Sequence, residues 1–319
     1  MENNLNTEKK RYDKKALEIK EQIEFIKNKN LNGLIEEELE NFLRCCGYYN
    51  FKGYFYIYLD ENKQFKKNVT WHNIKEDYAF DQEFKLLLFK YICIIEKSFK
   101  SAITNVSSVE YGNSWYVNKT IFKNEYMFNM NLLKLENSWE NDNYSTKKIK
   151  NHFNFKYPTD IRNGDIPSWI LFETCSFGVV SKIYSNFSSK SKICDKCHDF
   201  FNLKYAGNKG FLHSWIKVLV HIRNVIAHDG KLIDVHISDK LTYPALHNDE
   251  VEGKEKWVKK TTIFSILCVI KLMLKSTGRV DSFLNDIDVL INKFNHFNLY
   301  RLGFPENWQI FLKKVEKKS

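Results

Sequence analysis

The sequence contains few residues that interrupt helices. Four prolines and twelve glycines are spread over 319 residues, and these are the two residue types that most often end or break a helix. Their scarcity argues against a fold built from many short strands and tight turns. A hydrophobic fraction of 43% and an aromatic fraction of 15% are typical of a folded globular protein. We therefore expect an all-α, mostly helical fold.

Long apolar runs are also missing. The most apolar stretch, residues 86–95, is interrupted by Lys90 and is too short to cross a bilayer. Residues 1–15 are polar and basic, without the apolar segment of a secretory signal. These features predict a cytoplasmic protein with no membrane partner.

The cysteines do not form a disulfide or metal pattern. There are seven, an odd number, scattered along the chain, so reduced thiols are expected. Cys194-x-x-Cys197-His198 is the one segment with metal-ligand spacing, but a structural zinc needs four ligands and no second pair lies nearby. We expect neither a metal nor another cofactor.

Acidic residues are in the minority, with 39 against 49 basic residues and a net charge of +10. This excess favours a polyanionic partner such as a nucleic acid, or an anionic membrane surface.

Apolar periodicity locates the expected elements. Helices are predicted over residues 7–29, 34–46, 77–104, 166–186, 261–276 and 281–295, and a short one begins after residue 303. Residues 119–156 are interpreted as a helix followed by an irregular connection, and residues 231–260 as a small irregular insertion with a short strand or turn at Tyr243-Pro244. The proposed division is an N-terminal helical region with an aromatic arm, residues 1–70, and a helical domain, residues 71–319.

Residues 47–58 hold an aromatic run with two glycines. An extended segment or short hairpin arm is expected there, with Lys52 and Tyr54 available to contact RNA by charge and stacking. Alternatively, the rings fill the core between helices.

The segment His221–Gly230 carries the most informative chemistry. Arg223 is followed by Asn224 and, five positions after the arginine, by His228. An arginine holds phosphate oxygens with two parallel hydrogen bonds, and a histidine transfers protons near neutral pH. Together they suit metal-free cleavage of a phosphodiester, although the spacing alone is a weak signal.

The context supports a helix with one buried and one polar face. Apolar residues from Phe211 onward recur at helical spacing, and Gly230 stands where the helix should end. Four polar residues share the opposite face, namely Lys217, His221, Asn224 and His228. Equally, this face is simply solvated, with a histidine stabilised near the helix C-terminus.

Further candidates lie outside this helix. Glu96, at the edge of the apolar face of the 77–104 helix, is placed to bond a site histidine or arginine, or is merely half exposed. Lys190 and Lys192 make the segment before the Arg223 helix basic and are candidate RNA contacts.

Three segments together resemble a known family. Residues 47–54 are similar to the N-terminal signature of the AbiD/AbiF-like abortive-infection proteins. Pro167-Ser168-Trp169, followed by Glu173 and Phe177-Gly178, is similar to their central signature. Arg223-Asn224-x-x-x-His228 resembles the catalytic motif of the HEPN ribonuclease superfamily, to which that family belongs. One departure is Asn50, where relatives usually carry an arginine.

The resemblance implies a HEPN-like helical bundle with an N-terminal helical extension. It also implies phage defence by a metal-independent endoribonuclease that leaves 2′,3′-cyclic phosphate and 5′-hydroxyl ends. Because the chain has one copy of the motif, a composite site requires a homodimer, and association with a structured non-coding RNA is expected. In this site His228 is the general acid or base, Arg223 holds the phosphate, Asn224 orients the histidine, and His221 is a possible second proton carrier.

Two other functions remain open. The chain is alternatively a HEPN-like module that binds RNA without cleaving it, or an inhibitor of an acidic protein partner. Salt dependence separates the RNA functions from the third, because each phosphate contact releases counterions.

Overall fold

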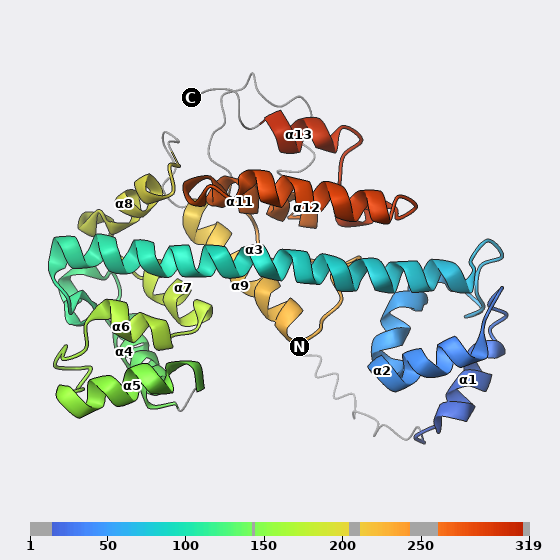
Figure 1. Cartoon of the computed structure of the whole chain (residues 1–319), viewed down its shortest axis with the longest axis horizontal. Coiled ribbons are helices and arrows are strands. Elements are labelled where there is room, and N and C mark those ends of the chain that lie inside the picture. The colour runs from blue at the N-terminus through green and yellow to red at the C-terminus, as the bar shows by residue number, and fades with distance from the viewer. Residues whose placement is uncertain (1–14, 142–143, 204–210, 243–260, 315–319) are drawn as a thin grey trace, which may run out of the picture. The chain divides into compact units, whose positions relative to one another are not determined.

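A computed structural model of the chain describes residues 15–141, 144–203, 211–242 and 261–314. Within these residues the regular elements are helices, and β pairing is limited to three isolated bridges (Figure 1). The expectation of an all-α fold is confirmed. No helix in the described ranges is long and apolar enough to cross a membrane. The chain divides into two compact units, one as far as Ala79 and one from Phe80 onward.

The first unit contains α1 (Ile19–Lys27), α2 (Glu36–Phe55), the short 3-10 helix η1 (Tyr56–Tyr58) and the start of α3 (Trp71–Tyr111). Its core is mainly aromatic and aliphatic side chains from all three α-helices, among them Ile26, Leu39, Phe51, Phe55, Trp71 and Ile74. The helix predicted over residues 7–29 corresponds to α1, which begins only at Ile19, because residues 15–18 are not helical. Residues 7–14 of the prediction lie outside the described residues.

The aromatic run of residues 47–58 is not an extended arm or hairpin. It continues α2 past a kink at Gly47, whose φ of 71° is left-handed, and then enters η1. Phe51, Tyr54 and Phe55 are spaced three and four residues apart, so they form one helical face, and all three are buried. This burial explains why the run is helical. The alternative, that the rings fill the core, holds for these three.

The second unit is organised around the part of α3 that follows Phe80. The predicted stripe on this helix is confirmed, because Phe84, Leu88, Tyr91, Ile95 and Phe99 are all buried. In Figure 1, α11 (Ile263–Leu274) and α12 (Val280–Lys293) lie on one side of α3, and α4 (Glu125–Glu140) to α7 (Phe177–Ser185) lie on the other. Every residue of α11 is buried, which makes it the most enclosed helix described.

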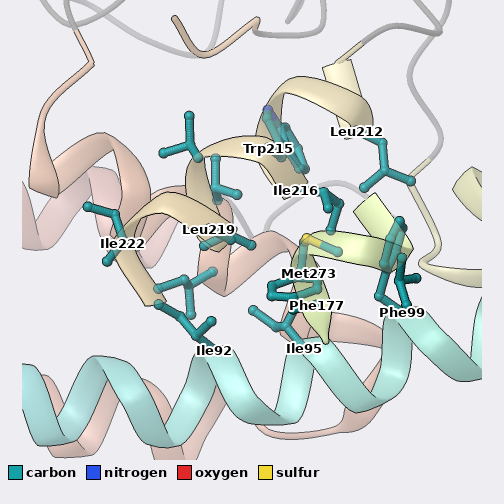
Figure 2. Packing of buried hydrophobic residues seen from close by; sticks show 14 of the residues in the cluster. Ile92, Ile95, Phe99, Phe177, Leu212, Trp215, Ile216, Leu219, Ile222 and Met273 are labelled. Atoms are coloured by element: carbon teal, nitrogen blue, oxygen red, sulfur yellow. The ribbon is translucent and has the colours of Figure 1, made fainter. Parts of the chain in front are cut away.

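Figure 2 shows how α3 meets α9 (Phe211–Ala227). Ile92, Ile95 and Phe99 point from α3 toward the apolar side of α9. Phe177 of α7 and Met273 of α11 fill the space between. This shared core fixes α9, and with it the Arg223 segment, against the middle of α3.

Two expectations about connections are corrected. The irregular connection expected within residues 119–156 contains a second helix, α5 (Tyr144–Lys156). Its Phe153 is buried with the ring centroid 6.1 Å from that of Trp139 on α4, and this contact stabilises the helix.

The single helix expected over 166–186 is two helices, α6 (Ser168–Thr174) and α7. The helical conformation is interrupted at Cys175, whose backbone is extended. The next residue caps α7, because the Ser176 hydroxyl accepts a hydrogen bond from the Val179 N–H. A Cβ placed on Gly178 would lie 3.7 Å from Val220 of α9, so α7 and α9 approach closely there.

Among the described residues, the α-helices not yet named are α8 (Ile193–Phe200) and α13 (Trp308–Lys314). The turn or strand expected at Tyr243-Pro244 lies outside the described residues.

Candidate functional site

Helix α9 buries one side and exposes the other, as its sequence predicts. Phe211, Trp215, Val218 and Ile222 are buried, and Val225 is half-buried. On the other side Asn224 and His228 are exposed, and His221 and Arg223 are half-buried. The apolar side therefore determines which polar side chains reach solvent.

The end of α9 is closed by a Schellman motif. The Gly230 N–H donates to the Val225 carbonyl at 2.7 Å, and the Asp229 N–H donates to the Ile226 carbonyl at 3.0 Å. Asp229 takes the left-handed conformation, with φ of 53°, that this motif requires of the residue after the cap. His228 is the cap residue, so its side chain leaves the helix at its C-terminal end.

A buried cluster of charges holds the segment that follows. Lys85 of α3 lies with its Nζ 2.5 Å from Asp229 Oδ1 and 3.5 Å from Asp81 Oδ2. Asp81 Oδ1 accepts hydrogen bonds from the N–H groups of Leu232 and Ile233. Lys85 and Asp81 are buried, so the hydrogen bonds to Asp81 are shielded from water, whereas the Asp229 side chain is 62% exposed. Together these contacts tie the chain after His228 to α3.

Asp81 and Lys85 were not predicted from the sequence as part of the site. Their pattern is nevertheless visible there, because two opposite charges four residues apart lie beside the apolar stripe that contains Phe84 and Leu88. Charged side chains at positions of this kind are rarely buried without a partner.

Arg223 faces a carboxylate on α3. Its Nε lies 3.8 Å from Glu96 Oε2, and Lys100 Nζ lies 3.3 Å from Glu96 Oε1. Lys100 also donates to the Cys175 carbonyl at 2.6 Å. The Glu96 side chain is only 12% exposed, and its carboxylate therefore positions two cations.

The guanidinium of Arg223 retains donors for a ligand. Its Nη1 donates to Asn224 Oδ1 at 3.5 Å, a long hydrogen bond, whereas its Nε is buried on the side of Glu96 and has no hydrogen-bond partner among the described residues. A phosphate oxygen can therefore bind the terminal nitrogens of the guanidinium without displacing a strong bond.

A cleft of about 550 Å³ adjoins Arg223. Its lining comes from α3, α4, the junction of α6 with α7, and α9: Glu96, Lys100, Lys134, Asn137, Ser138, Asn141, Glu173, Thr174, Cys175, Ser176, Val179 and Arg223. We call it the α4 cleft.

The structure brings only some of the predicted residues together. Arg223 pairs with Glu96 and donates a hydrogen bond to Asn224, and His228 is the cap residue at the end of the same helix. Lys217 instead forms an ion pair with Asp239 at 2.7 Å. Lys190 and Lys192 are exposed around the start of α8.

Lys52 and Tyr54 belong to the first unit. Lys52 is half-buried with its Nζ 5.7 Å from the centre of the Tyr56 ring. Tyr54 is 4% exposed, and its ring centroid lies 5.1 Å from that of Tyr78. Tyr54 is therefore a core residue, and its ring is not available to stack on a base.

In the described part of the chain, no group of three His, Cys, Asp or Glu side chains is placed to hold a metal ion. Burial raises the pKa of the Cys194 and Cys197 thiols.

Comparison with known proteins gives one match. The family described as Abi-like protein matches residues 41–234, a range that contains all three segments on which the resemblance was recognised. No curated protein matches the chain, and no solved structure does.

Proposed function

Since the chain belongs to the Abi-like protein family, a family of abortive-infection phage-defence proteins, we propose that it is a metal-independent endoribonuclease of the HEPN type. The observation that carries this proposal is the end of α9. There a guanidinium is held beside a cleft by Glu96, its Nη1 makes only one long hydrogen bond, and an exposed histidine follows at the helix cap.

RNA supplies its own nucleophile, so the protein has three tasks. It removes the proton of the 2′-hydroxyl, stabilises the charge on the phosphorane, and protonates the leaving 5′-oxygen. The 2′-oxygen forms its bond to phosphorus as the bond to the 5′-oxygen breaks, which leaves a 2′,3′-cyclic phosphate and a 5′-hydroxyl. Arg223 holds the phosphate, and His228 transfers a proton.

Two proton transfers need two groups, and each chain carries one copy of the motif. We propose that two copies of α9 meet across a two-fold axis in a homodimer, so that each site uses His228 and Arg223 of both subunits. Asn224, bonded to Arg223, orients the polar groups of this site, and His221 is an accessory proton carrier. A structured non-coding RNA is the proposed regulatory partner.

A second candidate function is RNA binding without cleavage. It is favoured by one observation: among the described residues no carboxylate contacts the His228 side chain, whereas acid–base histidines are commonly oriented by such a group. In this function Arg223 and the other cations hold RNA in a ribonucleoprotein.

The test compares wild type with Arg223→Ala and His228→Ala on end-labelled RNA in EDTA. Cleavage to cyclic-phosphate ends by wild type alone is expected, with each variant reduced by about a hundredfold or more. A substrate with 2′-deoxyribose at the cleaved position should remain intact, because it lacks the nucleophile. Loss of activity in EDTA, or cleavage of the deoxy substrate, contradicts the proposal. If all three proteins bind RNA and none cleaves it, the second function replaces the first.

A further inference from the structure

The α4 cleft extends the surface around Arg223 in one direction. Its four wall segments come from helices separated by long stretches of sequence, and its volume of about 550 Å³ is in the range of small-ligand sites. Arg223 contributes to its lining, so a polymer whose phosphate lies on Arg223 can continue into the cleft.

Lys134, which also lines the cleft, is an unneutralised cation. It forms no ion pair within the described residues, and it is half-buried on α4. Burial lowers the pKa of Lys134, and the nearby charge of Lys182 on α7 lowers it further. Lys182 also lacks an ion-pair partner in the described part of the chain. An anion bound beside Lys134 in the cleft favours its charged ammonium form and so offsets both effects.

The lining holds three cations, Lys100, Lys134 and Arg223, against two carboxylates, Glu96 and Glu173, so one net positive charge remains. Glu96 is engaged by Lys100 and Arg223. Glu173 is exposed on α6 and forms no ion pair with a residue that the structure describes.

Neutral polar groups complete the lining. The hydroxyls of Ser138 and Thr174 are used in hydrogen bonds to backbone carbonyls. By contrast, Asn137 on α4 and Asn141, the residue that ends the helix, are both exposed. Their amides carry donors and acceptors that match the edges of unstacked RNA bases.

We infer that the α4 cleft binds the nucleotide of a single-stranded RNA that adjoins the phosphate held by Arg223, with its outer phosphate on Lys134 and its base edge on Asn137. The guanidinium of Arg223 and the ammonium of Lys134 are groups that bind phosphates, and the amide of Asn137 is a group that binds a base edge. This inference rests on the proposed function, and it makes Lys134 and Asn137 determinants of substrate binding and base preference.

The experiment uses the full-length protein and a short, fluorescently labelled RNA with 2′-O-methyl groups, which cannot be cleaved through its 2′-oxygens. Binding is measured by anisotropy over a range of salt concentrations. Lys134→Ala is expected to weaken binding about fivefold or more and to reduce the salt slope by about 0.7, the value for one phosphate contact of a single strand. The matched control is Lys148→Ala, an exposed lysine on α5 that is absent from the cleft lining, and it should change neither quantity.

Asn137→Ala should leave the salt slope unchanged and alter the relative affinity for oligonucleotides of different base sequence. With a cleavable RNA, Lys134→Ala should raise KM while kcat changes little, because a contact made equally in ground and transition states is lost.

Unchanged binding by Lys134→Ala, while Arg223→Ala binds weakly, overturns the cleft assignment and leaves the nuclease proposal intact. An equal weakening of RNA binding by Lys148→Ala also overturns the cleft assignment, since both variants then act only by lowering the net charge. If wild type itself does not bind or cleave RNA, the proposed function has failed instead. Circular dichroism confirms that each variant is folded.

Discussion

Glu96 is the side chain on which the position of Arg223 depends. It lies 3.8 Å from the Arg223 Nε and 3.3 Å from the Lys100 Nζ, and its own side chain is 12% exposed. A carboxylate at this depth interacts with both cations through a medium less polar than water. Its role in the proposed reaction is therefore to position a guanidinium and not to transfer a proton.

Glu96→Gln tests this role at the scale of one residue. The amide keeps the shape of the side chain but loses the charge that orients Arg223. We expect kcat for RNA cleavage to fall about tenfold, because small displacements of a charge-stabilising group are costly. Affinity for the uncleavable 2′-O-methyl RNA should stay the same or rise slightly, since a negative charge near the phosphate is removed.

The matched control is Glu173→Gln, which removes the other carboxylate of the α4 cleft. Its kcat should remain close to that of wild type. An equal fall in kcat for both variants would show that the cleft responds to net charge and that the pairing with Arg223 is unimportant.

At the scale of an element, the C-terminus of α9 determines where His228 lies. The Schellman hydrogen bonds bring Gly230 against the preceding turn, and a Cβ on Gly230 would lie 2.8 Å from Val225 Cγ1 and 3.0 Å from the Val225 carbonyl oxygen. The second of these atoms is backbone and cannot rotate away. Glycine is needed here for close approach, and not for a left-handed φ.

Gly230→Ala is therefore expected to lower the free energy of unfolding by about 1–3 kcal/mol, the usual cost of overpacking. The rate of RNA cleavage should fall by more than the loss of folded protein explains, because the distorted turn contains His228. Gly178→Ala is the comparison. Its Cβ would make only a normal contact with Val220 at 3.7 Å, so stability should be unchanged or rise by about 0.4–1 kcal/mol.

Both variants are measured by thermal and urea unfolding. Equal stability of Gly230→Ala and wild type would mean that the turn relaxes without cost, and the argument for a rigid His228 would be lost.

At the scale of the whole molecule, the proposed site needs two chains. One chain supplies one Arg223 and one His228, and the two proton transfers of the reaction need two groups. The activity of a mixed dimer therefore distinguishes a composite site from two independent sites.

Heterodimers of a wild-type chain and an Arg223→Ala/His228→Ala chain are isolated by two different affinity tags. We expect cleavage activity far below half that of the wild-type dimer, because each composite site lacks one contribution. Activity of half the wild-type value would indicate independent sites. A monomer in sedimentation, at concentrations where cleavage is observed, would also contradict the composite site.

Local patterns in the sequence predicted the elements that depend on neighbouring residues. The long helix through Phe84–Phe99, the apolar side of α9 and its end before Gly230 all follow from side chains within one or two turns of each other. The errors arose where a distant contact decides the conformation. Residues 47–58 are helical because Phe51 and Phe55 are buried in the first unit, and α5 is helical because Phe153 packs near Trp139.

The sequence by itself determined that the chain is all-α and that Arg223, Asn224 and His228 share the end of one helix. It did so because helical periodicity and the position of glycine are properties of consecutive residues. Only the tertiary structure placed Glu96 beside Arg223, tied Asp229 to the buried Lys85, and assembled the α4 cleft from separate segments. These arrangements depend on which helical faces meet, and that choice is made by the total apolar area buried in the fold, a quantity that no short stretch of sequence contains.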